Sequence, residues 1–286
     1  MRGWWREMAG LVLPGSCGGC GRPRTALCPS CEVELTGAAR RVRPAPEPPG
    51  LPVVFAAAAY EGAARAVLLA HKERGALALA GPLGTALAGA VAAAAGGRGG
   101  LGDRPLLLVP VPSSRRSVRA RGHDPTRRIA LAAAGRLRRT GRVARVLPVL
   151  RQRREVADQA GLGARGRRAN LGGALEVSAA GLGPLGEAVR AGARVVLVDD
   201  LMTTGASLAE AARALAAAGR GLRSVPRVHR PFMSPGLLDR PKGVPAGGVT
   251  EGEFEQAAAA VVASSPSSFE INRNSWGTCV VAGGER

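Results

Sequence analysis

The chain has 286 residues, enough for one α/β core with accessory elements, and a formal net charge of +19. Hydrophobic residues make up 46% of the chain and aromatic residues only 3%, so its core must be built from small aliphatic side chains. The scarcity of aromatic residues argues against a protein that binds single-stranded nucleic acid by base stacking, whereas the positive charge leaves a polyanionic partner open.

Four cysteines define the first module, which we expect to span residues 10–40. They form two pairs, Cys17-x-x-Cys20 and Cys28-x-x-Cys31, separated by seven residues. This spacing predicts a structural Zn²⁺ site with four thiolate ligands and no open position for chemistry. Two disulfides or an iron–sulfur cluster would use the same residues. Disulfides need an oxidising compartment, and the apolar run 8–13 is too short for a signal peptide, so we expect a cytoplasmic zinc knuckle.

Residues 40–52 are rich in Pro and Arg and are predicted to form a linker. A strand is expected over 53–59, followed by a helix that ends near the segment His71-Lys72-Glu73-Arg74-Gly75. A second helix over 77–95 is largely apolar, but its Ala, Gly and Pro content favours a core helix over a membrane span.

The middle of the chain continues this alternation. Residues 106–111 predict a strand that runs into Pro112, Ser113 and Ser114, and a helix is expected to end near Arg139. Short strands are expected over 146–150 and 174–177, with a mobile loop or marginal helix over 151–170 between them. Residues 113–170 contain 17 arginines and only three acidic residues, a concentration of charge that suits pyrophosphate or a nucleic-acid strand.

The most specific pattern lies between residues 194 and 219. A core strand is predicted over 195–198, followed by Asp199 and Asp200 and then by the turn Thr203-Thr204-Gly205-Ala206-Ser207, which opens an Ala/Leu helix. Open α/β sheets hold ligands where a strand ends in such a loop, and the first N–H groups of the helix suit a phosphate. Since the acidic pair can accept hydrogen bonds from sugar hydroxyls, the segment predicts a ribose 5-phosphate site. An ordinary turn with an Asp cap is the alternative, but a cap needs neither the second Asp nor the TTG run.

The order of these elements predicts a twisted, mostly parallel sheet with helices on both faces over residues 53–228. A last strand near 222–228 is interrupted by Pro226. Pro, Gly and Ser dominate residues 229–286, with a helix-like patch over 251–263, and we expect this part to be a mostly disordered tail. Cys279 in it is expected to be a free thiol.

The segment 194–219 resembles the motif with which type I phosphoribosyltransferases bind 5-phosphoribosyl 1-pyrophosphate (PRPP). Residues 10–221 further resemble the ComF family, phosphoribosyltransferase-like proteins linked to DNA uptake. The resemblance rests, in order, on the cysteine knuckle, HKERG, VPVPSSRRSVRARGHD, RQRREVADQAGLGARGRRANLGGA and VDD…TTG. It implies the type I phosphoribosyltransferase fold and a Mg²⁺-dependent transfer of phosphoribosyl from PRPP to an unknown acceptor. It also implies single-stranded DNA or a DNA-uptake helicase as a partner.

The resemblance also assigns roles by position. Asp199 and Asp200 would bind the ribose hydroxyls directly or through Mg²⁺, and a mobile hood over 151–170 would close on the ligand. The residues with a catalytic role would be Asp199, Asp200, Arg115 and Arg116. The residues that bind PRPP would be Thr203, Thr204, Gly205, Ala206 and Ser207 at the 5-phosphate, Pro112, Ser113, Ser114 and Arg121 at the pyrophosphate, Gln159, Arg168 and Asn170 on the hood, and Lys72.

Two positions depart from the pattern. Guanine- and hypoxanthine-type salvage enzymes carry an Asp two residues before the motif glycine, where this chain has Thr203, so a 6-oxopurine acceptor is disfavoured. Asp124 stands where the ComF family often has Asn. Lys72 can instead close its helix electrostatically, and His123 is expected to be a polar loop residue. Because binding and catalysis would use the same residues, an enzyme, a PRPP sensor and a nucleic-acid-binding accessory factor are all compatible with the sequence.

Overall fold

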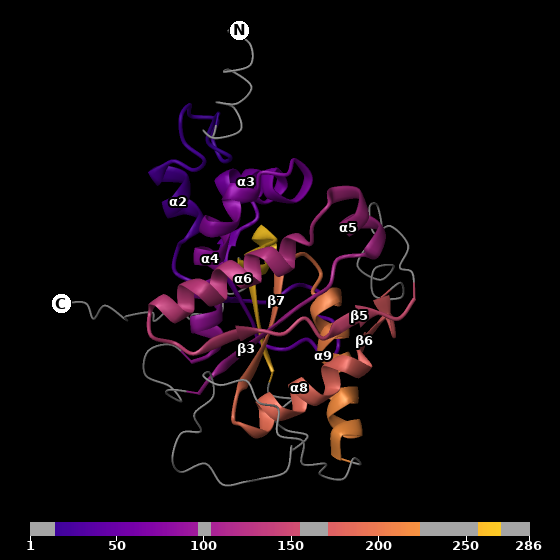
Figure 1. Ribbon diagram of the computed structural model, residues 1–286. Helices are drawn as coiled ribbons and strands as arrows, with labels where there is room; N and C mark the ends of the chain where they lie inside the picture. The colour runs from indigo at the N-terminus through magenta and orange to yellow at the C-terminus, as the bar shows by residue number, and fades with distance from the viewer. Residues whose placement is uncertain (1–14, 97–103, 155–170, 224–256, 270–286) are drawn as a thin grey trace, which may run out of the picture.

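The computed structural model describes residues 15–96, 104–154, 171–223 and 257–269. They form a mixed α/β structure around a six-stranded sheet with the order β1-β2-β8-β7-β3-β4 (Figure 1). The strands are β1 (Arg40–Val42), β2 (Val54–Ala59), β8 (Ala258–Ser264), β7 (Arg194–Met202), β3 (Leu106–Pro110) and β4 (Ala144–Val146). The edge strand β1 is antiparallel to β2, and all other neighbours in this sheet are parallel, as the sequence predicts.

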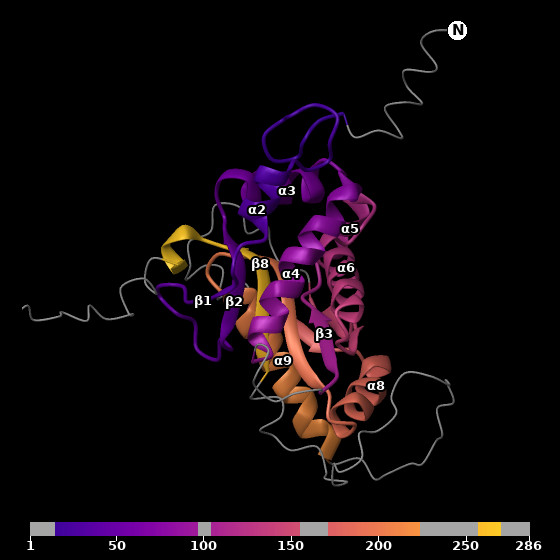
Figure 2. The same cartoon turned by 90° about the vertical axis from the view of Figure 1, so that its left-hand side faces the viewer.

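Helices cover both faces of the sheet. The helical elements in the described residues are α2 (Pro29–Leu35), α3 (Gly62–Glu73), the 3₁₀ turn η1 (Leu77–Leu79), α4 (Ala80–Ala94), α5 (Arg115–Arg121), α6 (Pro125–Arg139), α8 (Ala179–Arg190) and α9 (Ala206–Arg223), and of these α4, α6, α8 and α9 cover the sheet. Alternate residues of β7 serve the two layers: Val196 and Val198 pack with α4 and α6, whereas Val195 and Leu197 pack with α8 and α9. In both views α2 and α3 lie above the carboxyl ends of the strands (Figures 1 and 2).

The core is tightly packed because its side chains are small. At the crossing of α4 and α6, a Cβ on Gly84 would lie 2.4 Å from Cβ of Ala132 and 2.9 Å from the backbone of the same residue. The stretch Leu77–Ala94, in η1 and α4, is long and apolar enough to cross a membrane by length and composition. In the described part of the chain, however, more than half of it is buried between the sheet and α6, as a core helix would be.

The strand β8 corrects the prediction for the C-terminal region. Residues 251–263 were expected to contain a helical patch within a disordered tail, but Ala258–Ser264 form a strand that pairs with both β2 and β7. Every residue of this strand is buried. Its Ala-rich sequence favours a helix intrinsically, and burial on both faces of a parallel sheet overrides that preference. The core therefore extends well past residue 228.

Two smaller expectations are also corrected. The strand predicted over 146–150 is divided, since the chain leaves the sheet after Val146 and Pro148 has no N–H for a ladder bond. The second part becomes β5 (Leu150–Gln152), which pairs with β6 (Leu175–Val177) in a separate antiparallel ribbon. The predicted linker 40–52 contributes β1 to the main sheet. The strand expected near 222–228 falls partly on the end of α9 and otherwise lies outside the described residues.

Candidate functional site

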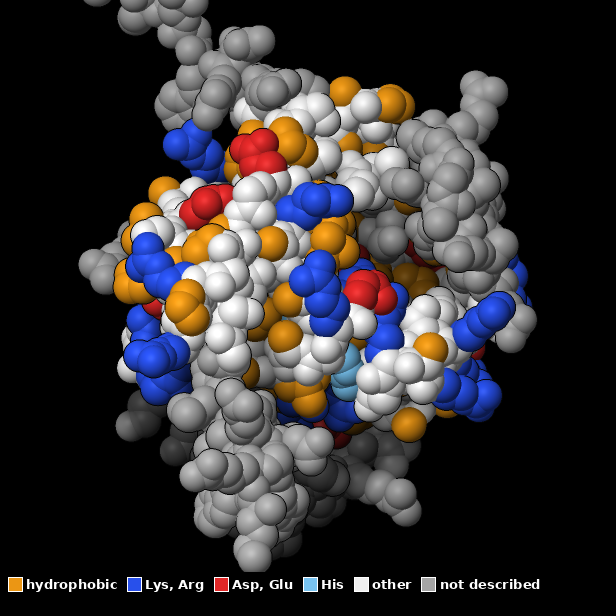
Figure 3. Space-filling model, turned by 90° about the horizontal axis from the view of Figure 1, so that it is seen from above, with side chains coloured by type: hydrophobic (Ala, Val, Ile, Leu, Met, Phe, Trp, Pro, Cys, Tyr) orange, Lys and Arg blue, Asp and Glu red, His pale blue; other side chains and the backbone are white. Residues whose placement is uncertain are grey.

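The topology of the sheet defines a switch point at its carboxyl edge, and we call this region the crevice. From β3 the chain moves outward to β4 on one side, and from β7 it moves to β8 on the other side, although β3 and β7 are neighbours. The loops that follow β3 and β7 therefore diverge, which is the switch point at which open α/β sheets bind ligands. Figure 3 looks down on this edge, where Lys and Arg side chains gather around a hollow that also exposes acidic groups.

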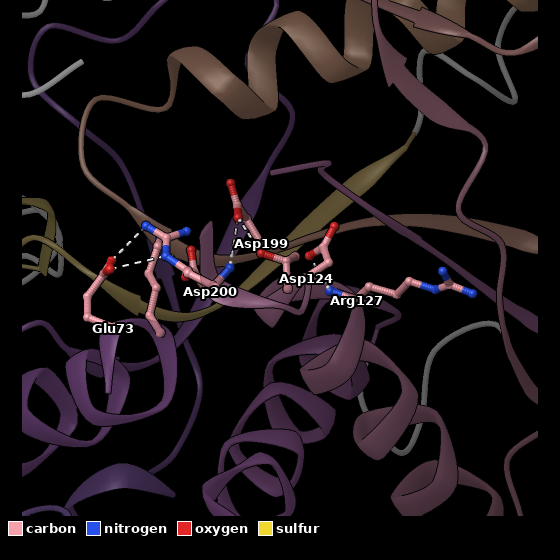
Figure 4. Close-up of polar contacts among 8 residues, drawn as sticks. Glu73, Asp124, Arg127, Asp199 and Asp200 are labelled. Atoms are coloured by element: carbon pink, nitrogen blue, oxygen red, sulfur yellow. Dashed lines mark hydrogen bonds and ion pairs between the residues drawn. The ribbon is translucent and has the colours of Figure 1, made fainter. Parts of the chain in front are cut away.

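The acidic pair lies at this switch point. Asp199 Oδ1 accepts the backbone N–H of Asp200 at 2.9 Å and the Thr126 hydroxyl at 3.4 Å. Asp200 is buried, and its Oδ2 lies 2.8 Å from Lys72 Nζ. Figure 4 shows the two aspartates between Glu73 on one side and Asp124 on the other. Carboxylate oxygens are the hard donors that Mg²⁺ prefers in proteins.

The electrostatics of the pair favour the arrival of a cation. Burial and the neighbouring charge of Asp200 raise the pKa of Asp199 well above its usual range, and Lys72 only partly offsets them. Burial opposes the charge on Lys72, but the attraction of Asp200 outweighs it and raises the pKa of the Lys72 ammonium. Lys72 thus partly compensates the charge of both carboxyl groups. Ionisation of Asp199 in addition to Asp200 stays unfavourable until a further positive charge binds.

The loop after β7 has the geometry of a phosphate cradle. Gly205 has φ +72°, a left-handed conformation that glycine adopts without strain, and a Cβ there would lie 3.0 Å from the Leu51 side chain. The helix α9 starts directly afterwards at Ala206, so the first N–H groups of its first turn lack intrahelical partners and point toward this loop. Thr203 is exposed and Thr204 is partly exposed at the same turn.

The loop after β3 is organised around a helix that the sequence did not indicate. Ser114 is the N-cap of α5, with its Oγ accepting the Ser117 N–H at 3.0 Å. Arg115 and Arg116 are exposed at the start of this helix. The guanidinium of Arg121 donates two hydrogen bonds to Glu73, from Nε to Oε2 at 3.1 Å and from the terminal nitrogen to Oε1 at 2.8 Å (Figure 4).

The structure thus brings together most of the predicted positions. Lys72 contacts Asp200, which directly follows Asp199 in the chain. The loops that start with Pro112 and Thr203 follow the neighbouring strands β3 and β7. The hood residues Gln159, Arg168 and Asn170 lie outside the described residues. Asp124 caps α6, with Oδ1 accepting the Arg127 N–H at 3.0 Å, a role that Asn fills equally well.

Sequence reasoning missed four residues near this crevice. Thr126 supports Asp199, and Glu73 holds Arg121. The other two, Glu210 and Arg213, tie α9 to β6: Glu210 Oε1 accepts the Leu175 N–H at 2.9 Å, and Arg213 donates to the Leu175 carbonyl at 2.8 Å. This pair anchors the ribbon of β5 and β6 to α9. Of the four, only Glu73 could have been found from the sequence, because it follows Lys72 in the HKERG segment and has the opposite charge.

Two histidines pack beneath the same region. The rings of His71 and His123 meet edge to face with centroids 5.5 Å apart, and His123 Nδ1 lies 3.1 Å from the Arg121 carbonyl oxygen. His71 is completely buried, and burial lowers its pKa. The contact connects the end of α3 with the turn between α5 and α6, so it positions both Lys72 and Arg121.

The four cysteines form a compact cluster at the opposite end of α3. Their sulfur atoms all lie within 4.8 Å of one another, and none of the four is in a disulfide. Cys20 Sγ and Cys28 Sγ are 3.6 Å apart, close to the separation of about 3.8 Å expected between thiolates on a tetrahedral Zn²⁺. Burial opposes ionisation of Cys17, but backbone N–H groups of the knuckle outweigh it and lower the pKa of this thiol to about 6. The cluster can therefore hold a structural metal such as zinc.

The knuckle is joined to α3 by packing and by a cap. Cys17, Cys28 and Cys31 pack against Ala63 at the start of that helix. Glu34 of α2 accepts the Ala63 N–H at 2.7 Å, which caps α3 from outside. The cysteine cluster and the acidic pair are thus connected through a single helix.

The chain matches no known family model, and no curated protein is significantly similar to it.

Proposed function

We propose that this protein binds PRPP with Mg²⁺ at the switch-point crevice and transfers its phosphoribosyl group to an acceptor, on the type I phosphoribosyltransferase fold that the ComF-like sequence suggests. One observation carries the proposal. An acidic pair lies near the end of β7, two residues before the strand ends, and a glycine turn and a helix N-terminus follow, at the point where the loop after β3 diverges. A sugar diol and a 5-phosphate have the spacing and chemistry for these two neighbouring features.

The proposed reaction needs charge stabilisation more than proton transfer. The bond from C1 of the ribose to pyrophosphate breaks with its electron pair on the leaving group, while the acceptor bonds to C1 and its proton passes to the departing pyrophosphate. Asp199 and Asp200 would hold the ribose end, and the cationic groups of Lys72 and Arg121 would face the leaving pyrophosphate. When bound, Mg²⁺ supplies further positive charge to the leaving group.

Calorimetric titration of PRPP with excess Mg²⁺ into the zinc-loaded chain tests this proposal. We expect binding by the wild-type protein and a loss of about 10- to 100-fold in affinity for Asp199→Asn/Asp200→Asn, because the charged acceptors are removed. Glu187→Gln, an exposed change on α8, is the matched control and should bind as the wild type does. Absence of binding by a folded, zinc-loaded wild-type protein would contradict the proposal. Pyrophosphate release with candidate acceptors then separates an enzyme from a sensor.

A second candidate function, nucleic-acid binding, is supported by the surface of α6. This helix carries five exposed arginines and no acidic residue: Arg127, Arg128, Arg136, Arg138 and Arg139. Phosphate contacts of this kind give an affinity that falls steeply with salt. Fluorescence anisotropy with a labelled single strand should show that dependence, and Arg127→Ala/Arg128→Ala should reduce its slope. Binding that is absent or insensitive to salt would exclude this candidate.

A further inference from the structure

Two adjacent residues at the end of α3 hold the charged groups of the crevice. Lys72 Nζ lies 2.8 Å from Oδ2 of Asp200, on β7. Glu73 accepts both hydrogen bonds of the Arg121 guanidinium, on α5. The two partners come from separate elements, and each is paired with the opposite charge. The last turn of α3 therefore neutralises both the negative charge of Asp200 and the positive charge of Arg121.

These two contacts have the chemistry of the proposed ligand. Lys72 places a positive charge on Asp200, as a bound divalent metal would. Glu73 places two anionic oxygens on Arg121, as a phosphate would, since a guanidinium binds a carboxylate or a phosphate through two parallel hydrogen bonds. The Lys72 ammonium thus occupies the place of the metal at Asp200, and the Glu73 carboxylate occupies the place of the pyrophosphate at Arg121.

The two pairs differ in how firmly they are held. Asp200 is nearly buried, with 6% of its side chain exposed, and Lys72 is 32% exposed. Glu73 is 47% exposed, and Arg121 is 22% exposed. Water therefore screens the Glu73 contact more strongly, and an incoming anion can replace it at little cost. The Lys72 contact lies deeper and requires a competing positive charge at Asp200 before it is released.

We propose that the last turn of α3 is a built-in competitor for Mg²⁺-pyrophosphate, the leaving-group end of the ligand. The inference rests on the function proposed above and adds a regulatory element to the same site. Because Lys72 and Glu73 are consecutive, a ligand that brings both a divalent cation and a pyrophosphate group displaces both contacts together. A free anion displaces only Glu73 and a free cation only Lys72, so the site discriminates in favour of the complex.

Binding of pyrophosphate in excess Mg²⁺ to the full chain, measured by calorimetry, tests the anionic half. Removing the competitor in Glu73→Gln should tighten binding about two- to fivefold, the range for a partly exposed ion pair. The matched control is Glu61→Gln, which removes the same charge at the exposed N-cap of α3. That position is about 18 Å away along the helix, beyond the screening length of about 8 Å at physiological salt, so Glu61→Gln should bind as the wild type does.

A double-mutant comparison assigns the effect to Arg121. Arg121→Gln should weaken binding, and adding Glu73→Gln to it should change nothing further, because Glu73 acts only through this guanidinium. Binding by Glu73→Gln that is unchanged or weaker, or equal tightening by Glu61→Gln, would overturn the inference while leaving the proposed function intact. Failure of the wild-type protein to bind either pyrophosphate or PRPP would overturn both.

The cationic half has its own readout. Mn²⁺ alone, followed by electron paramagnetic resonance, should bind several-fold more tightly to Lys72→Met, since the ammonium that competes for Asp200 is gone. Unchanged or weaker Mn²⁺ binding would contradict the assignment of Lys72 as a competitor.

Discussion

At the scale of single residues, Asp199 is held where its charge is unfavourable. Burial and the carboxylate of Asp200 raise its pKa well above the ordinary value of 3.8. The folded protein therefore keeps this proton to a higher pH than the unfolded chain does. It follows that stability falls as the pH rises from the unfolded value through the raised one. A residue that costs stability at neutral pH is typical of a functional site.

Asp199→Asn should accordingly stabilise the ligand-free protein. The amide oxygen can still accept the hydrogen bonds of Asp200 and Thr126, whereas the unfavourable charge is gone. We expect the thermal midpoint at pH 7 to rise by about 2–4 °C, and the gain to disappear below the unfolded pKa of 3.8, where Asp199 is protonated in both states. Asp124→Asn is the control, since Asn caps α6 as well as Asp does. A lower midpoint for Asp199→Asn in a pH series of thermal melts would contradict this account.

At the scale of elements, two glycines of α4 should respond in opposite ways to the same substitution. Gly89 faces open space, so Gly89→Ala should stabilise the protein by up to about 1 kcal/mol through helix propensity. Gly84 lies against α6, and the Cβ of Gly84→Ala would require the helices to separate, at a cost of about 1–3 kcal/mol. Urea unfolding of both variants measures the two changes. Equal effects would mean that the crossing of α4 and α6 is looser than described.

Elements with a local signal could be predicted, and those with a distant cause could not. The strand β7 and the start of α9 follow from the hydrophobic run and the TTG turn within a dozen residues. By contrast, nothing near residues 258–264 indicates a strand, since its partners β2 and β7 are far away along the chain. The site behaves in the same way. The acidic pair is readable as a motif, but its contact with Lys72 joins residues 128 positions apart.

At the scale of the whole molecule, the cysteine cluster should support the crevice through α3. Its members pack on Ala63, and Glu34 of the adjoining helix caps α3, whose far end carries Lys72 and Glu73. Loss of the metal should therefore weaken both the knuckle and the distant ligand site.

Replacing two ligands in Cys28→Ser/Cys31→Ser should abolish zinc binding, measured by elemental analysis, and lower the thermal midpoint by about 10 °C, as loss of several kcal/mol would do. Pyrophosphate affinity should fall as well. The control is Cys279→Ser, a cysteine outside the two CxxC pairs, which should retain one zinc per chain. Full stability without metal, or a thiol titration that reveals two disulfides in the native protein, would contradict a structural zinc site.

The position of β8 has a consequence for how the protein is made. This strand is the last of the main sheet in chain order, yet it separates β2 from β7 at the centre. On the ribosome, the knuckle and the first two strands emerge early, but they have no partner on the inner side until residues 258–264 have been synthesised. Until then, the facing edges of β2 and β7 are both unpaired. Such unpaired edges invite aggregation, so the interval before residues 258–264 are synthesised is the one in which this chain depends most on protection by chaperones.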